Sequence, residues 1–378
     1  MEENKHLHII SFEIPFPVEH GGMFDLFYKL AALQKQSIKI HLHCFENKRP
    51  HQNELKKYCE EVCYYKRKTG ILNLFKNLPY IVASRNDKVL TNKLLQDNYP
   101  ILLEGVQSCF IFRDERFNER KKFVRIHNVE QLYYATLGIN ERNYAKKKYF
   151  LKESALLKNF EKIIAEKATA CWVVSDNDFN FYKEKLICKH IRYLPVFIPQ
   201  WKINCSKGKG NYCLYHGNLS INENEIAAIW LIENVFDDLD FPIVIAGKNP
   251  SLKIKSIIKA ASNVSLLENP DDNTLNDLIR NAHINLVPSF NTTGIKIKLL
   301  NVLFNGRFCI ANDAAIAVAN LDKVCFVANT ADEFKQLINE MLQSSFDETK
   351  IQMRKNILLG EFDNEVSAKK VVEWIWEK

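Results

Sequence analysis

The segment INLVPSFNTTGIKIKLLNVLFNGRFCIAN runs from Ile284 to Asn312 and has the pattern of a strand, a polar loop, an amphipathic helix and a second strand. The apolar residues of the helix recur at helical spacing and predict one face packed on a sheet. They are Ile295, Leu299, Val302 and Leu303. A helix that connects two strands in this way is typical of a parallel sheet.

The beginning of this helix is a candidate anion site. Gly294 precedes the helix, and Lys296 and Lys298 lie in its first turn. Unpaired backbone N–H groups and the positive end of the helix dipole favour an anion there. Two lysines make a diphosphate site a reasonable hypothesis. The alternative is an ordinary strand–helix connection with lysines on its surface.

Strands and helices alternate along the rest of the chain, which favours parallel sheets covered by helices on both faces. In the first half, strands are expected at 7–13, 38–45, 100–105, 122–128, 170–175 and 191–195, and helices at 23–34 and 143–167. In the second half, strands are expected at 211–217, 241–247 and 264–268, and helices from about residue 222 and at 274–281.

A domain boundary is expected near residues 198–210, where Pro195 and Pro199 precede a Ser/Lys/Gly stretch suited to a linker. The predicted fold class is α/β, with two Rossmann-like doubly wound domains that face each other across a cleft. The first domain is expected at residues 1–200 and the second at 201–362. A C-terminal helix within 363–378 is expected to pack back on the first domain.

Length and composition indicate a large folded protein. The chain has 378 residues and 47% hydrophobic content, enough for a sizeable core and more than one domain. The first ten residues are too polar for a signal peptide, and no apolar run approaches ~18 residues. Ten cysteines without paired metal-ligand spacing predict reduced thiols in a cytoplasmic protein.

The two halves of the chain differ in charge. Residues 1–200 hold 33 lysines and arginines against 23 acidic residues, and residues 201–378 hold 19 against 22. Basic clusters in the first half could face an anionic membrane, which suggests peripheral association, or an acidic acceptor; the alternative is solvated surface charge. The clusters are Lys66-Arg67-Lys68, Lys121-Lys122 and Lys146-Lys147-Lys148. No nucleic-acid module accompanies them, so nucleic acid is not an expected partner.

Two loops that follow predicted strands of the first half carry candidate site residues. The first contains His20, Gly21 and Gly22, where paired glycines allow a ligand to approach the backbone. The second runs from Arg125 to Glu130 and holds His127, Asn128 and Glu130, which can bond a sugar or stabilise charge. A lone histidine near a strand end is often structural, and that alternative remains open.

Two corresponding loops follow strands of the second half. Gly217 and Gly247 stand where a strand turns into a loop, and Lys248 adds a cation. If these loops share one rim of the sheet, Lys248, Lys296 and Lys298 would converge on one diphosphate.

The sequence lacks the motifs that are typical of several other enzyme classes. There is no phosphate loop, nucleophile elbow or H-E-x-x-H motif, and the Gly21-Gly22 loop lacks the spacing of a nicotinamide dinucleotide site. Residues Asp176 and Asp178 suggest a metal, but after Ser175 we interpret them as the acidic first turn of a capped helix.

The order of these motifs resembles the GT-B glycosyltransferases, and most of all the retaining family 4 enzymes. The resemblance covers nearly the whole chain and rests on order and spacing more than on any single motif. In chain order the motifs are His20-Gly21-Gly22, Arg125 to Glu130, VSDND at 174–178, YHGNLSINEN at 215–224, VIAGKNP at 244–250 and PSFNTTGIKIKLLNVLFNG at 288–306.

The resemblance implies transfer of a sugar from a nucleoside diphosphate with retention of configuration and without a tightly bound metal or other cofactor. It implies that the first domain holds most of the acceptor and the second most of the donor. The residues matched to the reaction centre are His127, Gly21, Gly22 and Lys298. Those matched to the donor are Gly217, Gly247, Lys248, Thr293, Gly294, Ile295, Lys296 and Asn301, and those on the acceptor side are His20, Asn128 and Glu130.

The chain departs from the family pattern at two positions. Members often carry two glutamates eight residues apart around the last loop, where this chain has Thr293 and Asn301. An amide at Asn301 can still bond a ribose, whereas Thr293 supplies no carboxylate. Many members also place an Arg and a Lys after the first strand of the second domain, where this chain has Asn218 and 222–224. Lys248 and Lys296 are candidates for the missing positive charge.

The sequence therefore predicts a cytoplasmic glycosyltransferase that moves a sugar from a UDP- or GDP-sugar to a glycan or lipid-linked acceptor, as in surface polysaccharide synthesis. Two alternatives stay open. One is a nucleotide-sugar epimerase of the same fold, and the other is a non-catalytic subunit that binds a nucleotide sugar.

Overall fold

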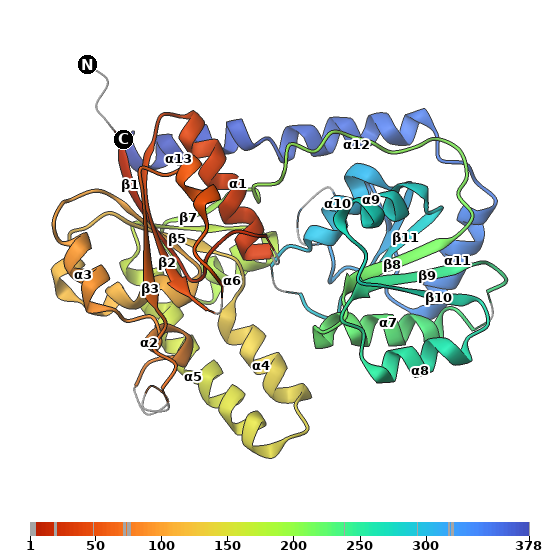
Figure 1. The fold of residues 1–378 in the computed structure, drawn as a ribbon, viewed down its shortest axis with the longest axis horizontal. Coiled ribbons are helices and arrows are strands. Elements are labelled where there is room, and N and C mark those ends of the chain that lie inside the picture. Colours follow the sequence, from red (N-terminus) through yellow and green to blue (C-terminus); the bar gives the residue numbers. More distant parts are fainter. Residues whose placement is uncertain are drawn as a thin grey trace. The chain divides into compact units, whose positions relative to one another are not determined.

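The chain forms two compact units, seen in a computed structural model that describes residues 5–18, 21–47, 49–70, 73, 77–237, 239–292, 294–316, 318 and 321–377. Unit 1 comprises Met1–Pro199 together with Phe362–Lys378, and unit 2 comprises Gln200–Glu361. Figure 1 shows that each unit has its own sheet with helices on both faces.

The described strands of unit 1 form one parallel sheet of order β3-β2-β1-β4-β5-β6-β7. They are β1 (His6–Ser11), β2 (Lys39–Glu46), β3 (Glu61–Lys66), β4 (Ile101–Glu104), β5 (Lys122–Ile126), β6 (Ala170–Val173) and β7 (Ile191–Tyr193). The helices are α1 (Gly21–Lys35), α2 (Tyr80–Ala83), α3 (Lys88–Leu94), α4 (Glu130–Asn140), α5 (Tyr144–Lys167), α6 (Asp176–Glu184) and α13 (Asn364–Trp376), with 3₁₀ turns at Asn53–Lys57, Val106–Arg113 and Glu115–Phe117.

The described strands of unit 2 form a second parallel sheet of order β10-β9-β8-β11-β12-β13. They are β8 (Cys213–Asn218), β9 (Ile243–Lys248), β10 (Val264–Glu268), β11 (Ile284–Val287), β12 (Phe308–Ala311) and β13 (Phe326–Val327). The helices are α7 (Asn222–Asn234), α8 (Leu252–Ala260), α9 (Asp272–Asn281), α10 (Ile297–Asn305), α11 (Ala331–Leu342) and α12 (Glu348–Glu361), with a 3₁₀ turn at Leu321–Lys323.

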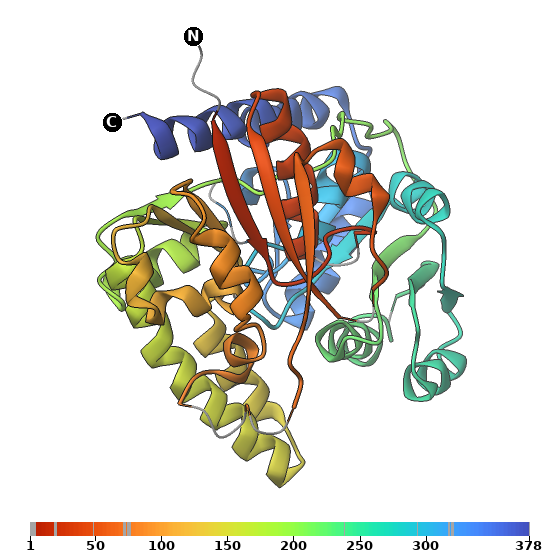
Figure 2. The ribbon, with the colours of Figure 1, turned by 60° about the vertical axis from the view of Figure 1, so that its left-hand side comes forward.

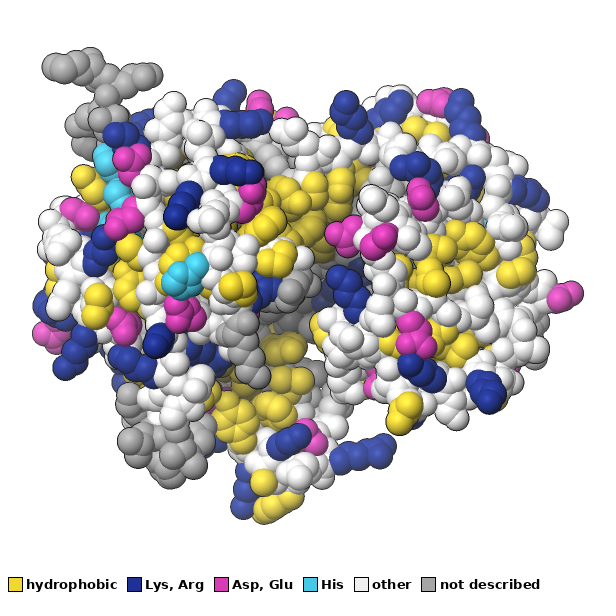
Figure 3. Space-filling model, in the orientation of Figure 1, with side chains coloured by type: hydrophobic (Ala, Val, Ile, Leu, Met, Phe, Trp, Pro, Cys, Tyr) yellow, Lys and Arg dark blue, Asp and Glu magenta, His cyan; other side chains and the backbone are white. Residues whose placement is uncertain are grey.

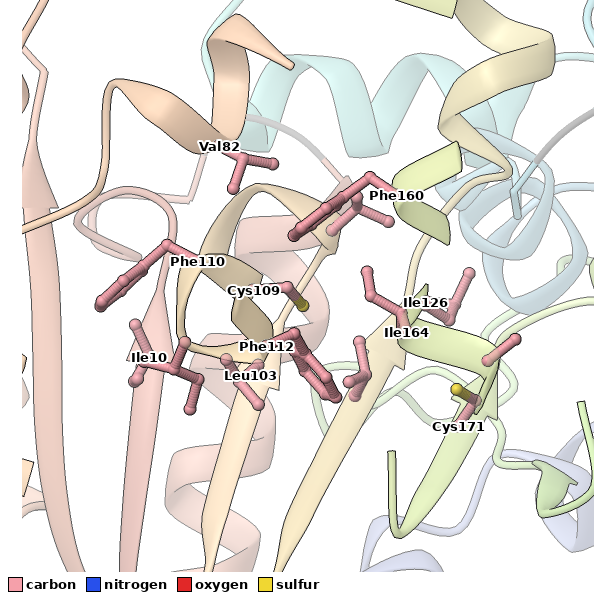
Figure 4. Packing of buried hydrophobic residues seen from close by; sticks show 14 of the residues in the cluster. Ile10, Val82, Leu103, Cys109, Phe110, Phe112, Ile126, Phe160, Ile164 and Cys171 are labelled. Carbon is pink, nitrogen blue, oxygen red and sulfur yellow. The ribbon is translucent and has the colours of Figure 1, made fainter. Parts of the chain in front are cut away.

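Central strands are buried on both faces because helices cover both sides of each sheet. All four residues of β4 and of β6 are buried, and helix α5 closes one face of the unit 1 sheet with Phe160 and Ile164. Figure 4 shows Ile164 beside Ile126 of β5, in the same cluster as Phe160 and Leu103 of β4. Each such side chain contributes about 1.5–3 kcal/mol when fully buried.

The C-terminal helix α13 belongs to unit 1 and packs on α1. Figure 2 shows the ribbon of α13 next to that of α1. Ala368, Val371 and Ile375 are buried in the same apolar cluster as Leu26 and Leu30 of α1. An apolar stripe at helical spacing therefore joins residues more than three hundred positions apart in sequence.

The α/β class with two parallel sheets is confirmed, whereas two strands were not predicted. In β3 only Tyr65 is buried, because β3 is an edge strand with a weak apolar pattern. Strand β13 is only two residues long. Helix α10 begins at Ile297, so Lys296 takes the N-cap position and Ile295 lies before the helix. The ten cysteines are free thiols, and no described helix is long and apolar enough to cross a membrane.

Two histidines on neighbouring strands form a buried hydrogen-bond chain in unit 1. His8 Nδ1 lies 2.9 Å from His43 Nε2, His8 Nε2 lies 3.0 Å from Asp97 Oδ2, and His43 Nδ1 lies 3.0 Å from the Tyr65 hydroxyl. With Asp97 ionised and both imidazoles neutral, Tyr65 donates to His43, His43 donates to His8 and His8 donates to Asp97. Burial lowers the pKa of His43 to about 3, and burial also lowers that of His8.

We predict that the contribution of His43 to the stability of unit 1 is lost as the pH falls below about 6.5. The unfolded chain takes up a proton on His43 near 6.5, whereas the folded chain does so only near 3, so acid favours unfolding by up to ~1.4 kcal/mol per pH unit for each such histidine. The thermal midpoint of the wild type, compared with that of His43→Phe, should fall between pH 8 and pH 5. This difference isolates His43, because burial raises the pKa of Glu130 to about 7 and that of Glu161 to about 8, and these two groups stabilise the folded chain as the pH falls. Exposed His51 is the control, since the midpoint of His51→Gln should keep a constant offset from that of the wild type. A constant offset between the wild type and His43→Phe would contradict the prediction.

Candidate functional site

Predicted site residues gather where the strand order of each sheet reverses. In unit 1 the reversal lies between β1 and β4, and in unit 2 between β8 and β11. The carboxyl ends of such strands diverge and leave room for a ligand. Gly22 follows β1, His127 follows β5, Gly217 lies in β8, and Lys298 lies in the helix that follows β11.

Four charged side chains without solvent exposure form a network at this end of the unit 1 sheet. Asp25 of α1 accepts two bonds from Arg125 of β5, at 2.8 and 2.9 Å, and one from Lys29 at 2.9 Å. Lys29 also donates to Glu104 of β4 at 2.7 Å. Arg125 continues to the carbonyls of Leu194 and Pro195, at 2.7 and 3.0 Å. The two carboxylates and two cations balance in charge and join α1 to the sheet.

His127 lies at the solvent side of this network, with its side chain 12% exposed. Its Nε2 lies 3.0 Å from Glu104 Oε2, and its Nδ1 lies 3.9 Å from Asp25 Oδ2. Burial raises the pKa of Glu104, but the charge of Lys29 and the bond from His127 outweigh burial and hold this pKa below its usual value. An ionised Glu104 can only accept, so Nε2 carries the proton and the ring is held in one tautomer.

Gly22 contacts the same histidine. A Cβ at Gly22 would lie 3.0 Å from Phe12 Cζ and 3.7 Å from His127 Cδ2. The residue after β1 and the residue after β5, predicted to share one site, therefore lie together in unit 1. Gly21 begins α1 beside them, while the predicted site residue His20 lies outside the described residues.

Among the described residues, Asp25, Glu104 and His127 are the group spaced to hold a metal ion, with ligand atoms within 4.8 Å of one another. They do not fit one, because the Lys29 ammonium already lies 2.9 and 2.7 Å from the two carboxylates. A divalent cation would be repelled by that ammonium at short range. The other acidic pair, Asp176 and Asp178, lies in the first turn of a helix capped by Ser175, as predicted: the Ser175 hydroxyl accepts from Asp178 N at 3.1 Å.

The other two residues predicted on the acceptor side contact each other. Asn128 hydrogen-bonds Glu130, which also accepts from Gln107 at 2.9 Å and is only 5% exposed. Burial raises the pKa of Glu130 to about 7. Of this pair, Asn128 is the side chain with more access to solvent.

Lys298 is the central residue of the unit 2 site. Its ammonium donates to Asn224 Oδ1 at 3.0 Å and to the Tyr215 hydroxyl at 3.4 Å, and it lies 4.9 Å from the centre of the Tyr215 ring. Both partners are neutral, and Lys298 forms no ion pair with any residue that the structure describes. Burial lowers its pKa to about 8, with a further decrease from Lys296 and an increase from Glu223. A partly buried cation without a paired carboxylate favours an anionic ligand.

Two glycines bring the ends of β8 and β9 close together. A Cβ at Gly247 would lie 2.2 Å from the Gly217 carbonyl oxygen and 2.7 Å from Leu219 Cγ. A Cβ at Gly217 would lie 3.2 Å from Asn224 Cγ, and Asn224 is the residue that accepts from Lys298. These glycines are needed for strand packing beside the lysine.

The remaining predicted donor residues differ in their surroundings. Gly294 is buried and has a φ of +66°, a conformation that favours glycine, whereas Ile295 is half-buried. Lys248 is exposed at the end of β9. Asn301 Oδ1 accepts from Asn305 at 2.7 Å, so this oxygen already has a partner within α10. The position of Thr293 lies outside the described residues.

Three polar side chains near Lys298 were not assigned from the sequence. Glu223 accepts from Ser289 at 2.9 Å and from Asn291 at 3.4 Å, which ties the start of α7 to the loop after β11. Asn224 is described above. The Nε2 atom of His216, a residue only 5% exposed, has no hydrogen-bond partner among the described residues. The signal available in the sequence was their place at the end of β8, for His216, and at the start of the helix that follows it, for Glu223 and Asn224.

No protein-family model matches the chain. An uncharacterised 44.6 kDa protein in the cps region of Klebsiella pneumoniae is 25% identical over 321 residues, which cover 80% of this chain and 81% of that protein. A glycosyltransferase from Rickettsia africae has a similar structure, with a TM-score of 0.66, 13% identity and coverage of 98% of this chain and 97% of that one.

Two further solved structures are similar. WaaG, a glycosyltransferase involved in lipopolysaccharide biosynthesis, has a TM-score of 0.65 at 11% identity over 98% of this chain and 100% of its own. Anabaena HepE in complex with UDP-glucose has a TM-score of 0.64 at 9% identity over 97% and 98%. These structures are GT-B glycosyltransferases, and the likeness shows that this chain has the GT-B fold.

We predict that Lys29→Met destabilises unit 1 by ~3–5 kcal/mol, because it leaves Asp25 and Glu104 buried with one cation fewer. Urea unfolding measures the loss. Lys35→Gln on the same helix is the matched control: its pair with Glu365 spans 3.5 Å between exposed side chains, so its loss should stay below ~1 kcal/mol. Equal losses in the two variants would show that the network does not hold unit 1 together.

Proposed function

We propose that this protein is a glycosyltransferase that transfers a sugar from a nucleoside diphosphate to a glycan or lipid-linked acceptor. The observation that carries the proposal is the Lys298 ammonium, which has only neutral partners beside the start of α10 in a chain with the GT-B fold. A diphosphate would supply the ion-pair partner that Lys298 lacks among the described residues.

The proposed roles follow from the contacts within each unit. In unit 2, Lys298, Lys296 and the backbone N–H groups at the start of α10 bind the diphosphate and stabilise it as it departs. In unit 1, His127 contacts the transferred sugar, with its ring held by Glu104. Retention of configuration and a reaction without a bound metal belong to the same proposal, with Lys298 supplying the positive charge that a divalent ion supplies in other transferases.

Surface polysaccharide synthesis in the cytoplasm is the proposed setting. It is supported by the relative in a cps region and by WaaG, whose description names lipopolysaccharide biosynthesis. UDP is the proposed nucleotide, since HepE was solved in complex with UDP-glucose.

Thermal shifts measured with UDP, GDP, ADP and TDP test whether the protein binds a nucleoside diphosphate and identify the preferred nucleobase. Product analysis with UDP-glucose then separates the candidates. Transfer to an added acceptor supports a transferase, a changed sugar without acceptor indicates an epimerase, and binding without turnover in extracts that contain native acceptors indicates a non-catalytic subunit. No stabilisation by any of the four nucleotides would overturn the proposal.

We predict that the affinity for UDP falls as the pH rises through about 8, because Lys298 loses its charge there. Lys298→Arg keeps its charge and should remove this pH dependence.

At pH 7, Lys298→Met should weaken UDP binding about 10- to 100-fold, as expected for loss of a hydrogen bond to a charged group, ~1.5–3 kcal/mol. Calorimetry measures all three proteins. Lys255→Met, which removes a surface pair with Glu268, is the control; wild-type affinity in Lys298→Met would exclude the assigned role.

We predict that His127→Asn lowers kcat about 100-fold while UDP affinity changes less than about twofold, because His127 lies in unit 1 and the diphosphate is assigned to unit 2. Steady-state kinetics and calorimetry separate the two effects. His190→Asn, at an exposed position of unit 1, should change neither quantity. An unchanged kcat in His127→Asn would remove His127 from the reaction. Added EDTA should leave the wild-type rate unchanged.

A further inference from the structure

Helices α4 and α5 form an antiparallel pair that projects from the sheet of unit 1, as Figures 1 and 2 show. Their close approach requires a glycine, since a Cβ at Gly138 would lie 2.8 Å from Leu151 Cδ2. We call residues 132–152 the hairpin tip. It comprises most of α4, the connecting residues and the first part of α5.

The hairpin tip exposes large apolar side chains. Ile139 is 69% exposed and Tyr144 is 70% exposed, on either side of the connection between the helices. Leu132 and Leu151 are also exposed. Single exposed apolar residues are common, but here they are gathered at one projecting end, which is a feature of interaction surfaces.

The same tip is strongly basic. It holds Arg142, Lys146, Lys147, Lys148 and Lys152 against a single acidic residue, Glu141. Lys148 lies 4.6 Å from the centre of the Tyr144 ring, so a cation and an exposed aromatic ring are presented side by side. Figure 3 shows apolar and basic side chains together at this end of the molecule.

The other basic clusters of unit 1 are engaged elsewhere. Lys122 is buried, and Lys121 donates to the Ile375 carbonyl at 2.9 Å. Arg67 donates to Ser84 at 3.0 Å, and Lys68 lies 3.4 Å from Asp87. Lys122 is buried and cannot contact a membrane, and of the three basic clusters of unit 1, the one in the hairpin tip lies among exposed apolar side chains.

We propose that the hairpin tip docks on an anionic lipid bilayer, with Ile139 and Tyr144 in the interface and the lysines against lipid phosphates. Lysines near such a surface attract it, and apolar side chains gain from leaving water. A second copy of the chain is a poorer occupant, because two tips of the same sign repel each other. This inference goes beyond the proposed transferase and does not depend on it.

Sedimentation of the full chain with phosphatidylcholine vesicles, with and without phosphatidylglycerol, tests the docking. Wild-type protein should bind the anionic vesicles at low salt and lose binding at high salt. A variant with Lys146→Gln, Lys147→Gln and Lys148→Gln should bind about 100-fold more weakly, since each lysine contributes roughly a factor of five. Ile139→Ser should weaken binding about 10-fold.

A matched control comes from α8 of unit 2, where Leu252 is 86% exposed beside Lys253. A variant with Leu252→Ser, Lys253→Gln and Lys259→Gln should bind vesicles like the wild type. Equal loss in this control, or no wild-type binding to anionic vesicles at low salt, would overturn the docking. So would a wild-type dimer that Ile139→Ser dissociates, because a second copy would then cover the tip. Unchanged UDP affinity in the lysine variant keeps this test separate from the proposed function.

Discussion

Compensation of buried charge is the constraint on which unit 1 depends. Asp25 and Glu104 lie in the protein interior, where an unpaired carboxylate would be very unfavourable, and Lys29 and Arg125 balance them. Because the four side chains come from α1, β4 and β5, their bonds fix how the helix lies on the sheet. The same bonds orient His127, which lies at the edge of the network and reaches solvent.

Unit 2 shows the opposite condition. Lys298 has neutral hydrogen-bond partners and a pKa lowered by burial, so its charge is poorly compensated in the protein alone. A protein that keeps a cation in this state gives up some stability, which is common at binding sites. The contrast between the two units gives a physical reason to assign structural support to Lys29 and ligand binding to Lys298, although both are lysines near strand ends.

Much of the fold was predictable from the sequence because its main patterns are local. The apolar runs at β1, β4 and β11 and the amphipathic pattern of α10 each lie within a few consecutive residues, and both sheets are confirmed. The sequence did not indicate edge strand β3, whose apolar pattern is weak, and it could not separate identical residue types with different neighbours, such as buried Lys122 and exposed Lys148. The cap at Ser175 was predictable because its partner, Asp178, is three residues away.

The amino-acid order alone was thus sufficient for the alternation of strands and helices, for the glycines at strand ends and for the presence of Lys298 at the start of a helix. It could not show that Lys29 joins Asp25 to Glu104, that Glu104 holds His127, or that Asn224 accepts from Lys298. The bonds from Lys29 to Glu104, from His127 to Glu104 and from Lys298 to Asn224 connect residues 75, 23 and 74 positions apart. Periodicity within a segment sets the first group, whereas burial and pairing of charges arise only when distant segments pack together.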